Sequence, residues 1–359
     1  MQDSHSNSSQ KEGSKSSHVE APKSEGLKAY PEEKEDEISR RIKNDPFYGL
    51  SFRVGVAENK NIVYRDKMED VHTYIANFAE RLDWGYFAIF DGHAGKQTAR
   101  WCGNNLHSLL EQEILASEHT EDKGDEASKA NGGSDMRENL NNVFVRADEL
   151  IEKQNNGSSG CTAVVAVLGW ELTDGSASEV PQGQEKCHPK YEYVPSPKHK
   201  RMLYTSNVGD SRIVLYRNGK SYRLTYDHKA SDVNEMDRIR DTGGLIMKNR
   251  VNGVLAVTRS LGDSYMKDLV IGNPFTTSTE ITPDDEFLVL ACDGLWDVIS
   301  DDKACQFIAD YFKSNSDPHD AAQKLCQLAM DNSTTDNVTV MIVKFDKDIF
   351  NVQKSATQS

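Results

Sequence analysis

The sequence has no long apolar run. None of its apolar stretches approaches the roughly 18 residues that a membrane-spanning helix needs, and the N-terminus lacks the basic start and apolar core of a signal peptide. Residue 2 is glutamine, whereas N-myristoylation requires glycine at that position. We therefore expect no association with a membrane.

Cysteine is scarce, and acidic residues outnumber basic ones. The six cysteines form no CxxC pair and show no regular spacing, so we expect reduced, mostly buried thiols in the cytosol or nucleus. The formal net charge of −15 repels nucleic acid and disfavours anionic membrane surfaces. Because the same charge repels phosphorylated substrates, a phosphate site here needs its own concentrated positive charge, which bound metal ions can supply.

Polar segments divide the 359 residues into one predicted catalytic domain and its appendages. Residues 1–45 hold too few apolar side chains to offset the entropy of ordering and are predicted to be a disordered tail. The catalytic domain is predicted at 46–346, with surface insertions near 117–135 and 171–200. A short C-terminal tail is expected at 347–359. Nothing in the sequence indicates an oligomer, so we expect a monomer.

Strand patterns and helix patterns are mixed along the predicted domain. Asn218-Gly219 favours a hairpin turn with positive φ at both residues, which implies antiparallel pairing. Asp317-Pro318 predicts an N-cap followed by proline at the first helical position. Antiparallel sheets covered by amphipathic helices, an α+β layered fold, follow from these patterns. Strands are expected at 52–57, 71–78, 86–90, 162–168, 202–207, 212–216, 221–225, 287–291 and 338–345, and helices around 99–110, 140–151, 304–312 and 321–329.

Aspartates stand beside turns at the ends of several apolar strands. Taken singly, each is most simply a turn residue, because its side chain bonds local backbone groups. Together with the adjacent acids Glu69 and Asp70, five segments could bring carboxylates to one edge of the sheets, where they repel one another unless cations lie between them. The four aspartates at strand ends are Asp91, Asp210, Asp293 and Asp336.

All-oxygen ligands favour Mg²⁺ or Mn²⁺ over zinc. No Cys/His cluster with zinc spacing competes in the sequence. Two such ions a few ångström apart can activate water and neutralise the oxygens of a phosphoryl group. The pattern therefore predicts hydrolysis without a protein nucleophile.

Seven short motifs occur in an order that resembles the metal-dependent protein phosphatases of type 2C, over about residues 52–345. A single DGH or GDS motif is weak, whereas seven motifs in order are specific. They are RDKMED at 65–70, DGHAG at 91–95, SGCTA at 159–163, GDSR at 209–212, LAVTRSLGD at 255–263, DGLWD at 293–297 and TDN at 335–337. The resemblance implies two packed antiparallel β-sheets flanked by antiparallel α-helices.

The resemblance also implies a role for each acid. Asp91 is expected to bridge two metal ions, and Gly92 to offer its backbone carbonyl. Further metal ligands are expected at Asp293 and Asp336, with Glu69 and Asp70 acting directly or through water. Asp210 and Asp297, together with Asp293, match positions that hold a weaker third metal in the family.

Two residues match catalytic positions of the family. Arg65 matches the residue that binds the substrate phosphate, which suits a planar fork able to bond two oxygens; the alternative is an ordinary surface arginine. His93 matches the general acid that protonates the leaving oxygen; the alternative is a structural histidine.

Asp263 follows residues 228–245, which resemble the family's mobile flap, and the sequence leaves open whether it only caps a turn. Cys161 replaces a more usual serine and is interpreted as a small core residue.

The hypothesis is a Mg²⁺- or Mn²⁺-dependent phosphatase acting on phosphoserine and phosphothreonine in proteins. The sequence is most similar to fungal members of the family that act on stress-activated MAP kinase pathways, which implies MAP kinases as substrates and an adaptor protein as a further partner. A cytoplasmic and nuclear location is expected. One alternative is an inactive phosphatase-like scaffold, which the presence of Asp91, Asp293 and Asp336 disfavours. The other is a different two-metal hydrolase such as a nuclease, for which the net charge has the wrong sign.

Overall fold

The computed structural model describes residues 45–121, 135–154, 157–173 and 188–355. The predicted disordered tail at 1–45 therefore lies almost entirely outside the described residues, as do 122–134 and 174–187 of the two predicted insertions. The described residues belong to the compact unit Asp45–Ser359. None of their helices combines the length and the apolar character that crossing a membrane requires.

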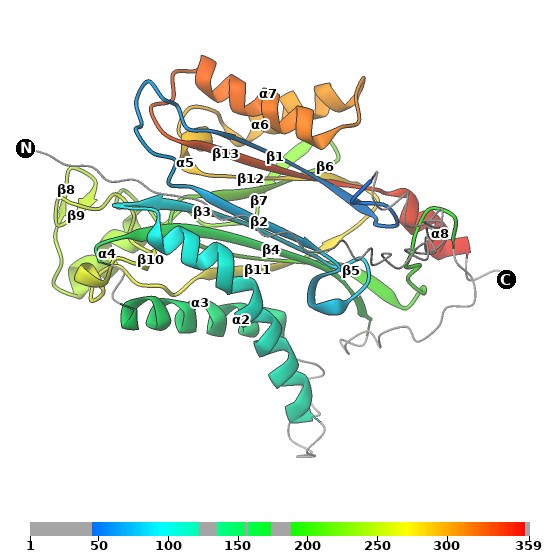
Figure 1. Cartoon of the computed structure of the whole chain (residues 1–359), viewed down its shortest axis with the longest axis horizontal. Helices are drawn as coiled ribbons and strands as arrows, with labels where there is room; N and C mark the ends of the chain where they lie inside the picture. Colours follow the sequence, from blue (N-terminus) through cyan, green and yellow to red (C-terminus); the bar gives the residue numbers. More distant parts are fainter. Residues whose placement is uncertain (1–44, 122–134, 155–156, 174–187, 356–359) are drawn as a thin grey trace, which may run out of the picture. The chain divides into compact units, whose positions relative to one another are not determined.

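Two antiparallel β-sheets pack face to face, as expected (Figure 1). Their facing side chains form a common core in which the rings of Phe52 and Phe87 meet edge to face, with centroids 5.4 Å apart. The five-stranded sheet has the order β1 (Phe52–Asn59), β13 (Val338–Phe345), β12 (Asp285–Ala291), β6 (Arg212–Arg217) and β7 (Lys220–Arg223). The six-stranded sheet has the order β11 (Phe275–Ile281), β5 (His199–Val208), β4 (Gly160–Leu172), β3 (Gly85–His93) and β2 (Val71–Ala76), with β10 (Leu261–Gly262) paired to β4.

Helices cover the outer faces of both sheets. On the six-stranded sheet, α2 (Gln97–Glu121) and α3 (Met136–Lys153) bury apolar side chains such as Leu106 and Phe144. On the five-stranded sheet, α6 (Asp301–Phe312) and α7 (Pro318–Asp331) bury Ile308 and Leu325. Figure 1 shows these helices as the two outside layers. The predicted α+β layered fold is confirmed.

Local signals predicted two junctions correctly. Asn218 and Gly219 have φ of 49° and 75° and connect β6 to β7, with Arg217 opposite Lys220. The Asp317 side chain accepts a hydrogen bond from the His319 amide at 2.9 Å and caps α7. Both depend on the backbone preferences of one or two residues, which the sequence displays directly.

Other elements carried no clear pattern. The edge strand β11 has the sequence FTTSTEI, in which Thr and Ser occupy both faces, so the apolar alternation that reveals a strand is missing. Helix α4 (Val233–Asp241) lies inside the segment 228–245 that resembles a flap, and the two-residue strands β8 (Ile246–Met247) and β9 (Arg250–Val251) come just after that segment. A one-turn helix α5 (Asp293–Trp296) leaves the end of β12.

The predicted short tail at 347–359 is helical over most of its described length. Helix α8 (Asp348–Ser355) buries Ile349 against Trp170 together with Tyr191 and Tyr193. Those two tyrosines come from the segment predicted as a surface insertion at 171–200, whose described part 188–198 is therefore partly core. Strand β4 extends into the same segment as far as Leu172. The sequence gives no sign of this contact, because eight residues of helix and a short loop are too short to show a clear apolar periodicity.

This packing gives a test of α8. Replacing Ile349, which is 2% exposed, by alanine leaves a cavity against Trp170, and we expect a loss of about 2–4 kcal/mol in the free energy of unfolding. Urea unfolding followed by tryptophan fluorescence measures it. Asn351→Ala, an exposed position on the same helix, is the matched control and should have almost no effect. Equal stabilities of the two variants would mean that α8 does not pack on the domain.

Candidate metal centre

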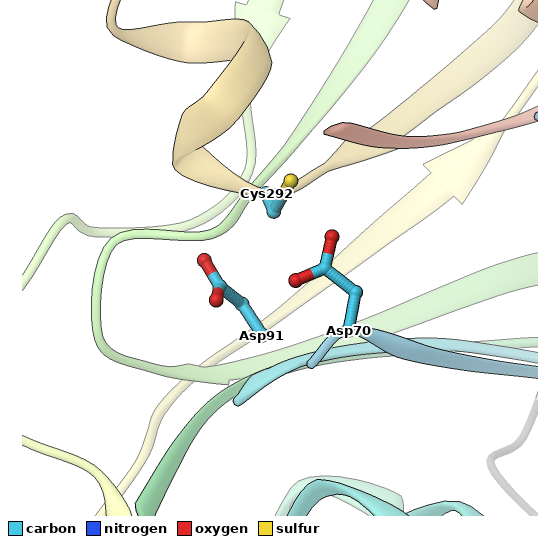
Figure 2. Close-up of side chains that lie close together, drawn as sticks. All are labelled: Asp70, Asp91 and Cys292. Atoms are coloured by element: carbon cyan, nitrogen blue, oxygen red, sulfur yellow. The ribbon is translucent and has the colours of Figure 1, made fainter. Parts of the chain in front are cut away.

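Carboxylates from the two sheets meet at one end of the sandwich. Asp91 lies near the end of β3, and Asp70 directly precedes β2, whose first residue pairs with Phe90. Cys292 follows β12 of the opposite sheet. Potential ligand atoms of Asp70, Asp91 and Cys292 all lie within 4.8 Å of one another. Figure 2 shows the two carboxylates side by side, with Cys292 above them.

Asp293 and Asp336 complete the cluster from neighbouring strands. Asp293 is the first residue of α5, and Asp336 lies two residues before β13, which pairs with β12. Gly294 is needed here, because a Cβ at this position would lie 1.9 Å from the carbonyl oxygen of Asn337. The close contact between α5 and the start of β13 therefore fixes the two acids near each other.

The protein alone does not neutralise this cluster. Burial is the main cause that raises the pKa of Asp70 to about 6, opposed by a hydrogen bond of 2.6 Å from the Thr339 hydroxyl. Burial and the neighbouring charges of Asp70, Asp293 and Asp336 raise the pKa of Asp91 well above its usual range. Burial and nearby acids do the same to Asp293. Ionised carboxylates at this spacing require positive charge between them.

Unpaired buried oxygens show where that charge would act. Asp70 Oδ1 and Asp293 Oδ1 are buried and have no hydrogen-bond partner within the described ranges. Such atoms are rare in folded proteins unless an ion or water satisfies them. Hard divalent cations prefer oxygen ligands. The donor set thus fits the predicted Mg²⁺ or Mn²⁺ better than a soft metal, and the Cys292 thiol is held by burial in its neutral form, with a raised pKa.

The remaining predicted ligands, Glu69 and Gly92, lie on adjacent backbone. A Cβ on Gly92 would lie 2.6 Å from the carbonyl oxygen of Glu69, so only glycine allows this approach. Asn337, to which the sequence gave no role, accepts from the Glu69 amide at 2.9 Å and donates to the carbonyls of Lys60 and Lys67. It therefore holds the segment before β2 against the segment before β13.

Arg65 contacts the carboxylate cluster. Its guanidinium forms an ion pair with Asp336 at 2.5 Å and donates from Nε to the carbonyl of Thr335 at 3.1 Å. Asn61 donates to the carbonyls of Thr334 and Asp336 and so anchors the turn that leads to Arg65. The side chain of Arg65 is 43% exposed, which leaves it accessible to a ligand.

His93 is held by a buried carboxylate. Its Nε2 lies 2.7 Å from Oδ2 of Asp263, which is fully buried and also accepts from the Ser260 hydroxyl. The Asp263 side chain forms no capping hydrogen bond to the following turn. The reading of Asp263 as an acid that only caps a turn is therefore excluded. The opposing residue on β4 is Gly160, where a Cβ would lie 2.5 Å from His93 Nε2 and 2.1 Å from Asp263 Oδ2.

Asp210 and Asp297, the acids predicted to hold a third metal together with Asp293, both form an ion pair with the same lysine. The Lys229 ammonium is 3.4 Å from Asp210 and 2.8 Å from Asp297. No motif of the sequence marks Lys229; the one available signal is its position just after His228, at the start of the segment that resembles a flap.

The family model for Protein phosphatase 2C matches residues 54–171 and 193–338. The chain belongs to the protein phosphatase 2C family. It is therefore a protein phosphatase enzyme with phosphoprotein substrates, and metal dependence is typical of protein phosphatase 2C enzymes.

Individual relatives support the assignment. Protein phosphatase 2C homolog 1 of Saccharomyces cerevisiae is 55% identical over 296 residues, which cover 82% of this chain and 94% of that protein. The Schizosaccharomyces pombe protein of the same name is 38% identical and covers 84% of this chain and 76% of its own length. A phosphatase structure from Toxoplasma gondii shares the fold, with a TM-score of 0.62 at 21% identity over 84% of this chain and 94% of that one.

The carboxylate cluster of this protein phosphatase 2C chain allows a test of whether Asp293 binds metal. Asp293→Asn removes one charge, so we expect weaker Mn²⁺ binding and almost complete loss of activity, while the thermal stability in EDTA holds or rises because repulsion is relieved. Calorimetric titration with Mn²⁺, a phosphopeptide assay and thermal unfolding in EDTA measure the three effects.

Glu286→Gln on strand β12 is the matched control, because it removes one exposed acid upstream of the cluster. It should leave Mn²⁺ binding and turnover unchanged. Full Mn²⁺-dependent turnover in Asp293→Asn would exclude Asp293 as a ligand.

Proposed function

We propose that the chain hydrolyses phosphoserine and phosphothreonine in proteins, with two Mg²⁺ or Mn²⁺ ions at the carboxylate cluster and a weaker third ion beside it. The observation that supports this is the meeting of acids from both sheets around buried oxygens that lack a partner in the described segments. The proposed ligands are Asp91, the carbonyl of Gly92, Asp293 and Asp336, with Glu69 and Asp70 acting directly or through water, and Asp210 and Asp297 for the third ion.

The chemistry divides between the cations and the chain's own residues. Bound divalent cations supply the positive charge that lowers the pKa of water and neutralises phosphoryl oxygens. Arg65 exchanges its contact with Asp336 for two oxygens of the substrate phosphate, which its planar fork suits. The exposed guanidinium can make this exchange by a side-chain movement alone.

His93 is proposed to protonate the leaving group. In the doubly protonated ring, Nε2 donates to the Asp263 carboxylate, which orients the ring, and Nδ1 carries the proton for the substrate. As the ester bond between phosphorus and the serine or threonine oxygen breaks, Nδ1 gives this proton to that oxygen. The oxygen of water forms the new bond to phosphorus and one water proton is released, which restores the proton of the ring, so the products are an alcohol and inorganic phosphate.

The surface next to Arg65 supports a polypeptide substrate. Ile62, Val63 and Tyr64 are 77%, 77% and 59% exposed and precede Arg65 directly in the chain. Consecutive exposed apolar side chains are unusual on a surface without a binding role. The resemblance to fungal members supports MAP kinases among the substrates, and the five described cysteines, all free and buried, support a reducing location such as the cytoplasm and nucleus.

One assay separates the proposal from its two rivals. A phosphothreonine peptide and DNA are each offered with Mn²⁺ and with EDTA. Release of phosphate from the peptide only with Mn²⁺ supports the proposal. Cleavage of DNA would favour a nuclease, and no reaction on either substrate would favour an inactive scaffold.

The role of His93 predicts a dependence on the leaving group. An alkoxide leaves poorly without a proton, whereas a nitrophenolate spreads its charge over the ring. His93→Ala should therefore slow phosphopeptide hydrolysis by roughly 10²–10⁴-fold and slow p-nitrophenyl phosphate hydrolysis much less. Both kcat values are compared at saturating Mn²⁺, because the histidine is next to proposed ligands.

His319→Ala, on the exposed face of α7, controls for the loss of a histidine as such and should leave both rates unchanged. Equal slowing of the two substrates by His93→Ala would make His93 a structural or positioning residue, and the general acid would then be another group.

A further inference from the structure

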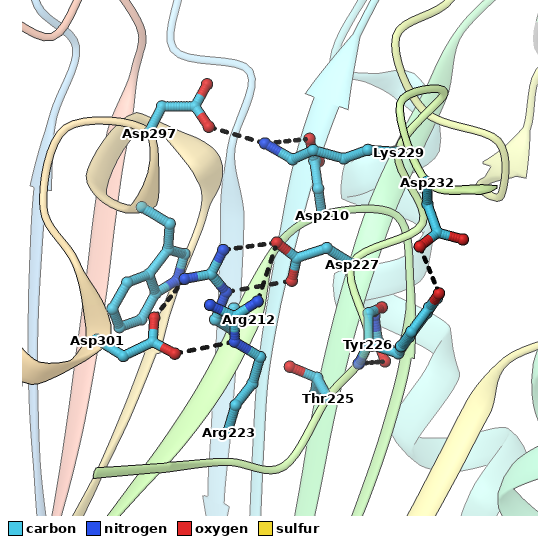
Figure 3. A network of polar contacts seen from close by, with 12 residues as sticks. Asp210, Arg212, Arg223, Thr225, Tyr226, Asp227, Lys229, Asp232, Asp297 and Asp301 are labelled. Atoms are coloured by element: carbon cyan, nitrogen blue, oxygen red, sulfur yellow. Dashed lines mark hydrogen bonds and ion pairs between the residues drawn. The ribbon is translucent and has the colours of Figure 1, made fainter. Parts of the chain in front are cut away.

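A lysine lies where three acids converge. The Lys229 ammonium is 3.4 Å from Asp210 Oδ2 and 2.8 Å from Asp297 Oδ1, and Figure 3 shows it between the two carboxylates. The charge of Asp293 also acts on it. Burial lowers the pKa of Lys229, but Asp210 and Asp297 outweigh this effect and hold that pKa above its ordinary value. The ammonium is thus a cation already present in an acidic site.

One ammonium does not balance this site. Three carboxylates around a single positive charge leave an excess of two negative charges, and Asp293 Oδ1 is buried without a partner among the residues described. A divalent cation would balance more of the charge and could use that oxygen. The ammonium and the ion compete for Asp210 and Asp297, because both need the same carboxylate oxygens.

We propose that Lys229 is a built-in competitor of the third divalent cation: it occupies the space between Asp210 and Asp297 and has to leave before that ion binds. This inference rests on the proposed function. The third site then binds its ion weakly, because binding there includes the free-energy cost of displacing a charged side chain. It also keeps the buried Asp210 paired while the ion is absent.

The exchange needs only a side-chain movement. The backbone around Lys229 is fixed on both sides, by a hydrogen bond of 2.9 Å from the His228 amide to the Gly209 carbonyl and one of 3.0 Å from the Ala230 amide to the Ala256 carbonyl. A β-bridge joins Lys229 itself to Val257. The flexible four-carbon stem can nevertheless turn its ammonium into solvent.

A neighbouring ion-pair network provides the control. Arg212 bonds Asp227 and Asp301 and lies over the Trp296 ring, and Arg223 bonds Asp301 at 2.9 Å (Figure 3). This network ties the start of the flap-like segment to α6 but does not involve Asp210 or Asp297. Arg223→Gln therefore removes a positive charge and an ion pair from the same region without touching the proposed competition.

The first test counts bound Mn²⁺ and measures each affinity, by electron paramagnetic resonance of free Mn²⁺ and by calorimetry on the full chain. Lys229→Met keeps the stem and removes the charge, so the weakest binding step should tighten by about tenfold or more. Lys229→Arg retains a competing cation and should bind within about threefold of the wild type, as should Arg223→Gln. The two tighter steps should change little.

An unchanged weakest step in Lys229→Met, or equal tightening in Arg223→Gln, would overturn the proposal. If Lys229→Met binds two ions tightly and its third binding step is unchanged, this inference is wrong and the proposed function stands. If the wild type binds no Mn²⁺, the proposed function and this inference are both wrong. The experiment therefore distinguishes the two failures.

The second test uses the wild type and does not depend on how a variant folds. Reductive methylation with formaldehyde and borohydride is quantified at Lys229 by mass spectrometry, with rising Mn²⁺ and with EDTA. Displacement into solvent should increase the labelling of Lys229 severalfold at the Mn²⁺ concentrations that fill the weakest site, while the exposed Lys303 stays constant. Labelling that does not respond to Mn²⁺ would contradict displacement.

Discussion

Repulsion between carboxylates in a small volume is the constraint on which this structure depends. Asp70, Asp91 and Asp293 are brought together by strand ends of two different sheets, and burial makes their negative charge costly. Side-chain bonds to the backbone, above all those of Asn61 and Asn337, hold the segments in place against this repulsion. The result is a site with a strong preference for cations.

Two cations of the chain itself lie against this cluster. Arg65 pairs with Asp336 on one side, and Lys229 pairs with Asp210 and Asp297 on the other. Both are on long side chains that can move, and both contact acids that are proposed to bind metal. A single principle thus connects them, because each neutralises an acid when a ligand is absent and is free to move when one binds. For Arg65 the proposed ligand is the substrate phosphate, and for Lys229 it is the divalent ion.

Close backbone contact sets the geometry of the groups that are proposed to be catalytic. Glycine at position 160 lets Asp263 and His93 approach each other across β4, and glycine at position 92 lets β3 pass close to the carbonyl of Glu69. Both glycines lie on strands, Gly160 on β4 and Gly92 on β3, which suits groups that must hold fixed distances.

The sequence by itself determined the local structure and the type of chemistry. The turn at Asn218-Gly219, the cap at Asp317 and the acids at strand ends are properties of a few adjacent residues, and the motif order identified the family before any distance was known. Only the tertiary structure decided that Asp263 holds His93, that Lys229 lies between Asp210 and Asp297, and that α8 is part of the core. These contacts join residues far apart in the chain, or depend on side-chain direction across two sheets, and no local backbone preference records such distances.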